Sequence, residues 1–249
     1  MFNMPEYINK ILATLHTAGY EAFVVGGAVR DMVLGNIPTD FDITTSCPPE
    51  NTVQLFKKTV ATGIKHGTVT VFMDEKSAEV TTFRHEKGYT NRRSPDSVTF
   101  ISALDEDLKR RDFTINAMCY CKEKGLIDNF GGRDDIKNRI IRAIGNPNER
   151  FCEDALRILR AFRFSAKLNF EIEKETFESA IKNANLLKEI SRERIFAELR
   201  QILLSPYPKN IEPLINCGAF EFLGIKSAQN LEELDILPKE FNIRFYHLP

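Results

Sequence analysis

The sequence predicts an α/β domain followed by a helical domain, with the boundary near residue 140. A strand–turn–helix unit around Gly26-Gly27 is followed by hairpin-forming runs, which favours a sheet of mixed or antiparallel strands over a doubly wound one. After about Asn138 the chain changes to segments with helical periodicity, separated by turn residues. At 249 residues, 43% of them hydrophobic, the chain can bury a sizeable core in one or two domains.

The elements of the α/β domain follow from local patterns. Ile8, Ile11, Leu12 and Leu15 fall on one helical face, which predicts a helix over residues 5–18 that Gly19 ends. The remaining expected elements are a strand at 21–25, a helix from about Val29, a strand at 40–44, a helix from Pro48 through Phe56, a hairpin of strands 68–72 and 79–83, and a strand at 98–101.

The second domain is expected to contain only helices. Its expected helices span residues 151–166, 174–183, 191–204 and 211–217. The final residues, FNIRFYHLP, carry neither a helix cap nor a polar tail, so we expect the chain to stop inside a domain.

Composition excludes several classes of protein. The net charge of −1 argues against a purely electrostatic nucleic-acid binder, although an enzyme with local positive charge remains possible. Basic clusters at residues 84–93 and at Lys109-Arg110-Arg111 are by default solvated surface. The five cysteines form no C-x-x-C pair, which predicts a reduced, cytoplasmic chain without zinc. No apolar run reaches the roughly 20 residues of a membrane span, and the first residues do not form a secretory signal.

Gly26 and Gly27 form the first candidate site. A glycine pair between strand and helix lets backbone N–H groups approach a polyphosphate at a helix N-terminus. Arg30, in the first turn, is placed to fork onto phosphate oxygens. A glycine pair on its own is more often only a tight turn.

Asp40 and Asp42 give the turn a chemical meaning. Residues i and i+2 of a strand point to one face, so both carboxylates project together. Such a pair repels unless a cation lies between its members, and hard divalent cations such as Mg²⁺ prefer carboxylate oxygen. A two-metal phosphoryl-transfer site follows, with Glu79 as a third carboxylate or, equally, an exposed strand residue.

The segment from Arg110 to Ala117 is the second candidate. Asp112 and Asn116 are four residues apart and are expected on one helical face, beside Arg111. An acceptor next to a group that both donates and accepts suits a ribose hydroxyl. The alternative is a helix start capped by Asp112 after a basic loop.

The third candidate is Glu153-Asp154-Ala155-Leu156-Arg157. A carboxylate at Asp154 and a guanidinium at Arg157 match the amino group and ring nitrogen of cytosine or adenine and oppose uracil and guanine. Glu153 is placed to orient Arg157. The alternative is an exposed i,i+3 ion pair worth a few tenths of a kcal/mol.

Five motifs in order resemble class II CCA-adding tRNA nucleotidyltransferases, a set that bacterial poly(A) polymerases largely share. They are GGAVRDMVLGNIPTDFDITT, RRDFTINAM, LIDNFGGRDD, EDALRILRAFRF and ISRERIFAEL, and they cover about residues 20–200. The resemblance implies a catalytic head at 1–140, a base-selecting neck at 141–205 and the start of a helical body at 206–249, in a chain shorter than is usual for the family.

The resemblance also assigns roles to residues. It implies that Asp40 and Asp42 bind the metal, that Gly26, Gly27 and Arg30 bind triphosphate, and that base choice lies at Asp154 and Arg157. Ribose selection falls to Asp112 and Asn116, with Arg111 beside them, and further nucleotide contacts fall to Arg160 and Arg163. A loop at residues 85–95 occupies the place of one that CC-only members lack.

The expected function is addition of CCA to the 3′ end of tRNA from CTP and ATP with Mg²⁺. A-only addition and poly(A) synthesis are the enzymatic alternatives. A non-catalytic RNA- or nucleotide-binding module is the alternative from another class, although such a module has no need for two metal carboxylates.

Overall fold

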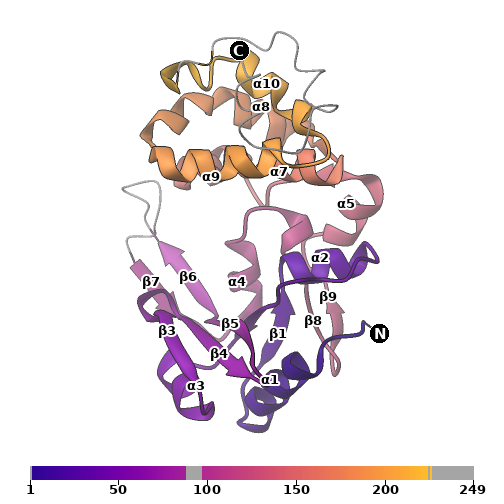
Figure 1. Ribbon diagram of the computed structural model, residues 1–249, viewed down its shortest axis with the longest axis vertical. Helices are drawn as coiled ribbons and strands as arrows, with labels where there is room; N and C mark the ends of the chain where they lie inside the picture. The colour runs from indigo at the N-terminus through magenta and orange to yellow at the C-terminus, as the bar shows by residue number, and fades with distance from the viewer. Residues whose placement is uncertain (1, 88–96, 224, 226–249) are drawn as a thin grey trace. The chain divides into compact units, whose positions relative to one another are not determined.

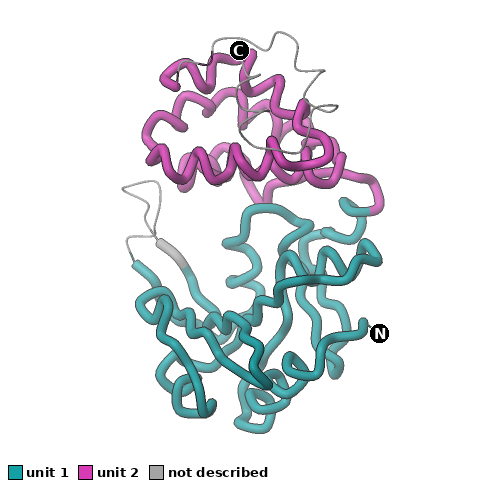
Figure 2. The backbone as a smooth tube through the Cα atoms, in the orientation of Figure 1, with its two compact units in different colours: residues 1–87, 96–136 teal, residues 88–95, 137–249 magenta. Residues whose placement is uncertain are grey.

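The structure, a computed structural model, describes residues 2–87, 97–223 and 225. The chain divides into two compact units, residues 1–87 with 96–136 and residues 88–95 with 137–249 (Figure 2). Each unit is described by itself below.

A seven-stranded mixed sheet forms the centre of the first unit (Figure 1). Its order is β3-β4-β5-β2-β1-β8-β9, and every neighbouring pair is antiparallel except β2 and β5, which are parallel. The predicted mixed sheet is therefore confirmed. Its strands are β1 (Ala22–Val25), β2 (Asp42–Thr45), β3 (Thr59–Gly63), β4 (Thr68–Met73), β5 (Lys76–Thr82), β8 (Cys119–Cys121) and β9 (Gly125–Ile127).

Helices pack against this sheet through the apolar faces that the sequence predicts. Helix α1 (Glu6–Thr17) buries Ile8, Ile11, Leu12 and Leu15, the four residues of the expected stripe. The other elements of the unit are α2 (Gly27–Val33), α3 (Pro49–Leu55), α4 (Leu104–Lys109), the 3₁₀ turns at Ile64–His66 and Thr114–Asn116, and the hairpin β6 (Arg84–Lys87) with β7 (Ser97–Phe100). Helix α5 (Gly132–Asn138) follows them in the chain.

The second unit is mostly helical, with one short pair of strands that the sequence did not predict. Parallel β10 (Ile140–Ile141) and β11 (Glu171–Ile172) join its first residues to the segment after α7. Its core is formed by the inward faces of α6 (Pro147–Glu153), α7 (Leu156–Leu168), α8 (Lys174–Lys182), α9 (Arg192–Leu203) and α10 (Glu212–Asn216), with 3₁₀ turns at Ala184–Glu189, Pro208–Ile211 and Glu221–Leu223.

The single helix predicted over residues 151–166 is wrong, because the chain breaks at Asp154. The backbone there is extended, with φ −140° and ψ 103°, so α6 ends at Glu153 and α7 begins at Leu156. The side chain of Asp154 accepts a hydrogen bond from the backbone N–H of Leu156 at 3.1 Å, in the manner of an aspartate that starts a turn.

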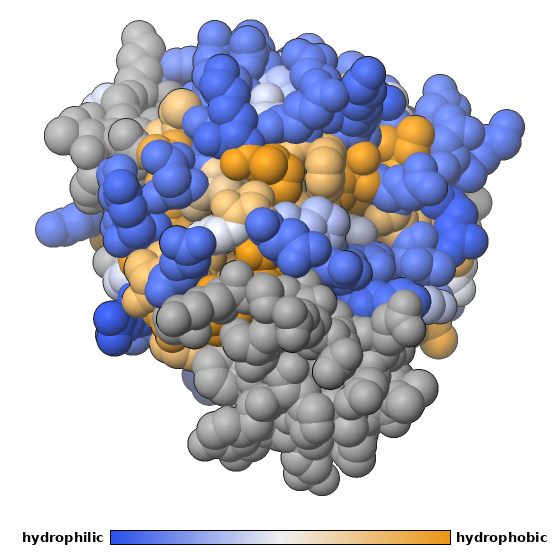
Figure 3. All heavy atoms as spheres, turned by 90° about the horizontal axis from the view of Figure 1, so that it is seen from above, coloured by the Kyte–Doolittle hydropathy of each residue, from blue (hydrophilic) through white to orange (hydrophobic). Residues whose placement is uncertain are grey.

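Figure 3 shows one face, on which apolar residues form a band bordered by hydrophilic ones. Among the described residues, large apolar side chains more than a third exposed include Ile37, Phe100 and Tyr207. No helix in the described ranges is both long and apolar enough to cross a membrane.

Asp107 of α4 is a fully buried carboxylate that holds several elements of the first unit together. Thr44 of β2 donates to it at 2.9 Å, Arg110 Nε donates at 2.9 Å, and Arg111 Nη2 lies 3.3 Å away. Burial alone would raise the pKa of Asp107, but the charges of Arg110 and Arg111 and the hydrogen bonds from Arg110 and Thr44 outweigh it and lower the pKa. The Lys109-Arg110-Arg111 cluster, expected to be solvated, is thus in part internal.

Asp107→Asn should destabilise the protein by about 2 kcal/mol, because charge-assisted hydrogen bonds to two arginines become neutral ones. A carboxyl with a lowered folded-state pKa stabilises the protein at neutral pH, and that contribution is lost as the pH falls through this pKa. The difference between parent and variant in denaturant unfolding should therefore be largest near pH 7 and shrink on acidification. Asp105→Asn, an exposed change on the same helix, is the control; equal effects of the two variants would contradict this role.

Candidate active site

Three carboxylates gather on the exposed side of two neighbouring strands. Asp42 opens β2 and is the register partner of Glu79 in β5, and both side chains are exposed. Asp40, also exposed, lies two residues before Asp42, and the intervening Phe41 is buried. The parallel pairing of β2 with β5 therefore brings together residues 37 positions apart in sequence, which alternation along either strand alone does not indicate.

The strand that carries Asp40 and Asp42 begins later than expected. Its pairing with β1 ends at Val25 with Asp42, because the chain turns away at Gly26. Asp40 is therefore next to the strand rather than inside it, although the alternation of exposed and buried residues continues through Phe41.

The electrostatic surroundings of the Asp42 carboxylate favour binding of a cation. The pKa of its carboxyl is raised, first because the surrounding protein removes part of its hydration, then because of the charge of Glu79 and, more weakly, of Asp40. Arg111 acts in the opposite direction and lowers this pKa. Three carboxylates with too little neutralising charge are the donor set that a hard divalent cation prefers.

Gly26 makes the turn between β1 and α2 and requires glycine. Its φ of 73° lies in the left-handed region, and its N–H donates to Met118 O at 3.3 Å. A Cβ at this position would lie 3.5 Å from Arg111 Nη1, so the guanidinium of Arg111 is next to the turn. Arg111 Nε is buried and has no hydrogen-bond partner among the described residues. A guanidinium and a glycine turn beside the carboxylates form a suitable place for a triphosphate.

Arg30 does not present the open fork expected for phosphate. It is 3% exposed, and its guanidinium donates to Asp31 Oδ1 at 2.9 and 2.7 Å and to Asn116 Oδ1 at 2.8 Å. In this arrangement Arg30 positions Asn116, and its contact with a triphosphate stays a prediction. Burial of the α2 face, which the sequence pattern did not reveal, is the reason that the fork is not open.

Asp112 and Asn116 do lie together, but not on a helical face. Asn116 ends the 3₁₀ turn at Thr114–Asn116, and Asp112 lies two residues before that turn. Asn116 Nδ2 donates to Asp112 Oδ1 at 3.2 Å, and the same oxygen accepts from Phe113 N at 2.9 Å. A chain of hydrogen bonds thus runs from Arg30 to Asn116 and on to Asp112, so the position of each side chain depends on the others.

The N-terminal residues of helix α5 pack against the 3₁₀ turn at Thr114–Asn116. Asp128 accepts from the N–H groups of Gly132 and Arg133, each at 2.8 Å, which satisfies two free donors of the helix N-terminus. A Cβ at Gly132 would lie 2.4 Å from Thr114 O, so only glycine allows this approach. Thr114 Oγ1 in turn donates to the buried Asp135 at 2.6 Å. The motif LIDNFGGRDD therefore acts on the site through packing.

In the second unit, the break between α6 and α7 carries the residues expected to read the base. Arg157 Nη1 donates to Glu153 Oε2 at 2.7 Å and to the carbonyl of Arg150 at 3.1 Å. Asp154 Oδ2 accepts from Arg194 Nη2 of α9 at 3.1 Å. Asp154 and Arg157 therefore each have another protein partner, and the exposed pair on one helix surface is not what the structure contains.

Comparisons with known proteins match segments of both units. Residues 22–142 match a family described as the poly A polymerase head domain, and residues 169–228 match a probable RNA and SrmB-binding site of polymerase A. The CCA-adding enzyme of Streptococcus gordonii is 49% identical over 234 residues, which are 93% of this chain and 59% of that protein. The chain belongs to the class II CCA-adding nucleotidyltransferase family.

Solved structures of CCA-adding enzymes have the same fold. The Bacillus stearothermophilus CCA-adding enzyme in complex with CTP superimposes with a TM-score of 0.78 at 43% identity, covering 85% of this chain and 52% of that one. The Thermotoga maritima CCA-adding enzyme complexed with tRNA gives a TM-score of 0.75 at 27% identity, covering 93% and 56%. The chain thus spans between half and three fifths of the length of these relatives.

The expected loop and the two arginines expected to contact nucleotide stay predictions. Residues 88–95 of the predicted loop lie outside the described residues. Arg160 and Arg163, expected to contact nucleotide, lie 4.0 and 2.9 Å from the carboxylate of Glu198, and both stack on Phe164. Their guanidinium groups already have protein partners in α9, which sequence spacing could not show.

Sequence reasoning missed two residues that hold candidate site residues in place, Asp107 in the first unit and Arg194 in the second. Arg194 belongs to the motif ISRERIFAEL, so its signal was present without a role. The spacing of Asp107 from Arg110 and Arg111, at i+3 and i+4, was a local signal, but its burial and its hydrogen bond from Thr44 of β2 had none.

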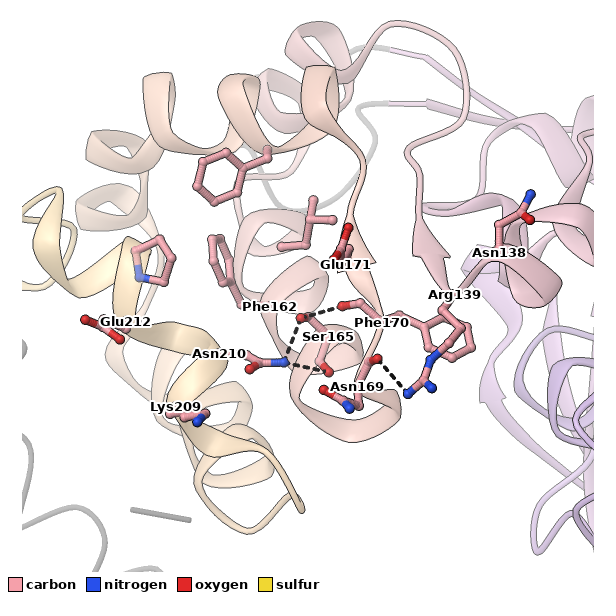
Figure 4. A pocket seen from close by; sticks show the side chains of 13 residues that line it. Asn138, Arg139, Phe162, Ser165, Asn169, Phe170, Glu171, Lys209, Asn210 and Glu212 are labelled. Carbon is pink, nitrogen blue, oxygen red and sulfur yellow. Dashed lines mark hydrogen bonds between the residues drawn. The ribbon is translucent and has the colours of Figure 1, made fainter. Parts of the chain in front are cut away.

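A cavity of about 830 Å³ in the second unit contains none of the expected site residues (Figure 4). Arg139, Ser165 and Asn210 line it, and Asn210 donates to Ser165 O at 3.2 Å and to Ser165 Oγ at 3.1 Å. Asn210 and Ser165 are thus held by each other.

Proposed function

We propose that this chain is the nucleotide-adding part of a CCA-adding enzyme, which joins CMP, CMP and AMP from CTP and ATP to the 3′ end of tRNA and releases pyrophosphate. The observation that carries the proposal is the pairing of Asp42 with Glu79 next to Asp40. The turn at Gly26 and the guanidinium of Arg111 lie beside each other at this site. Identity of 49% to a CCA-adding enzyme over nearly the whole chain supports it. The same relationship supports a head up to about residue 140, a neck over 141–205 and a body from 206.

Asp40, Asp42 and Glu79 would hold Mg²⁺ in this proposal. Their all-oxygen donor set and the raised pKa of Asp42 fit divalent ions. When bound, such ions activate the attacking 3′ hydroxyl and neutralise the charge of the triphosphate and leaving pyrophosphate. The five free cysteines are consistent with the cytoplasmic location that belongs to the same proposal.

The remaining residues would orient the nucleotide. Arg111 and the backbone of Gly26-Gly27 would donate to triphosphate oxygens, with Arg111 Nε available as a buried donor. Asn116, held by Arg30 and Asp112, would contact the ribose. Arg157, held by Glu153, and Asp154, held by Arg194, would present the edge that fits cytosine or adenine.

Single-nucleotide incorporation tests the function. The acceptors are tRNA transcripts that lack CCA, end in C or end in CC, together with an unstructured RNA, each with one labelled NTP at a time. We expect CMP on the first two acceptors and AMP on the third.

Each alternative gives another pattern. AMP only on the transcript ending in CC indicates an A-adding enzyme. AMP runs on every RNA indicate a poly(A) polymerase, which the description of the matched head domain keeps as the second candidate. Retention of RNA or nucleotide without incorporation indicates a binding module.

Asp112→Ala should reduce the preference for ATP over dATP roughly tenfold, because Asn116 loses the acceptor that orients its amide. Incorporation of both nucleotides by parent and variant measures the effect. Asp134→Ala, an exposed change in α5, is the control. An unchanged ratio in Asp112→Ala would remove this residue from ribose selection.

A further inference from the structure

A second group of ligating side chains lies in the first unit, on different residues from the carboxylate site. It consists of His16 at the end of α1, Cys121 at the end of β8 and Glu123 in the turn between β8 and β9. One ligand atom from each residue lies within 4.8 Å of the others. Sequence spacing does not reveal this group, because His16 lies far along the chain from Cys121 and Glu123.

The hydrogen bond of His16 decides how its ring is used. Nε2 lies 2.9 Å from the carbonyl oxygen of Ala22, and a carbonyl only accepts, so Nε2 carries the proton. Nδ1 then faces Glu123 Oε2 at 3.7 Å. In the neutral ring both of these atoms are acceptors, and they repel unless a proton or a metal ion lies between them. A histidine whose other nitrogen donates to a backbone carbonyl is oriented as metal-bound histidines usually are.

The donor set selects the class of ion. A thiolate, an imidazole and a carboxylate together suit a borderline ion such as zinc, whereas magnesium prefers oxygen alone. Tetrahedral zinc, with bonds of about 2.0–2.3 Å, places its ligand atoms about 3.3–3.7 Å apart. The separation of Nδ1 and Oε2 already fits this range, and the carboxylate of Glu123, whose side chain is 65% exposed, lies beside the buried Cys121.

We propose that His16, Cys121 and Glu123 form a zinc site, with water as the fourth ligand, that ties the end of α1 to the β8–β9 hairpin. The site is separate from the nucleotidyltransferase chemistry and does not depend on it. Binding to the folded state alone stabilises the protein by linkage.

Cobalt(II) binding to the full chain tests the proposal. The protein is stripped of metal with a chelator and titrated with Co²⁺ in excess Mg²⁺, so that the carboxylate site is not counted. We expect a thiolate-to-cobalt charge-transfer band that saturates at one ion per chain and that zinc removes. Cys121→Ser should lose the band, and Cys152→Ser, an exposed cysteine, should keep it.

His16→Gln keeps the test valid if the buried Cys121→Ser variant does not fold. Loss of a ligand should weaken cobalt binding at least as much as the roughly 10–100-fold typical of changes behind a ligand. Zinc should raise the thermal unfolding midpoint of the parent and leave that of His16→Gln unchanged. The absence of a band in the parent, or equal affinity in His16→Gln, would overturn the site and leave the contact of His16 with Glu123 without a metal.

Discussion

Asp42→Asn should reduce nucleotide incorporation roughly a thousandfold or more while the protein stays folded. Asp42 pairs in register with Glu79 and lies two residues after Asp40, so it connects the other two carboxylates of the candidate metal site. Loss of several kcal/mol of transition-state charge stabilisation corresponds to a factor of this size. Incorporation of labelled CMP into tRNA lacking CCA measures it, and Glu50→Gln, an exposed change in α3, is the control.

The unfolding stability of Asp42→Asn, measured without metal, separates an effect on catalysis from an effect on folding. Because the folded protein raises the pKa of Asp42, its ionised form is unfavourable in the folded state, and this cost is relieved as the pH falls through the folded pKa. In chelator at neutral pH, Asp42→Asn should therefore unfold at the same or higher denaturant concentration than the parent. A large loss of stability would give Asp42 a structural role instead.

Arg157→Ala should lower the use of CTP and ATP together, by roughly ten- to hundredfold. A lost charge-assisted hydrogen bond to the ring nitrogen that both bases share costs about 1.5–3 kcal/mol. UTP and GTP should gain relative to them, because Arg157 no longer opposes their ring N–H. Incorporation of all four nucleotides is the measurement.

A structural role for Arg157 predicts a different result. The side chain is buried and tied to Glu153 and Arg150, so alanine also removes packing. Arg157→Lys keeps the charge but loses the fork, and should change base preference with little loss of stability. Lys167→Ala, an exposed change in α7, should change neither. Loss of stability in Arg157→Ala with base preference intact would contradict base reading.

Local patterns predicted the parts of the fold that depend on local spacing. The stripe of α1, the turn at Gly26 and the hairpin of β4 and β5 follow from helical periodicity, glycine and alternation. Strand β3, with the sequence TVATG, and the three-residue strands β8 and β9 were not predicted, because their pairing partners rather than their own composition define them. The helix break at Asp154 was missed because apolar periodicity continues through it.

The sequence predicted which residues belong to the candidate site but not the contacts that hold them. Asp40, Asp42 and Glu79 came from residue type and strand alternation. The contacts of Arg30 with Asn116, of Arg194 with Asp154 and of Asp107 with Thr44 were not predictable, since each joins segments or faces that only tertiary packing brings together. Some arginines that were expected to face solvent or substrate therefore hold other protein side chains in position.

Sequencing the 3′ ends of tRNA after incubation with CTP, ATP and Mg²⁺ tests the central claim most directly. The substrate is a transcript lacking CCA, and the parent protein is compared with Asp42→Asn. The account predicts ends that terminate in CCA with the parent and unextended ends with the variant. CCA addition by Asp42→Asn at the parent's rate, or ends extended by adenosine alone with the parent, would contradict it.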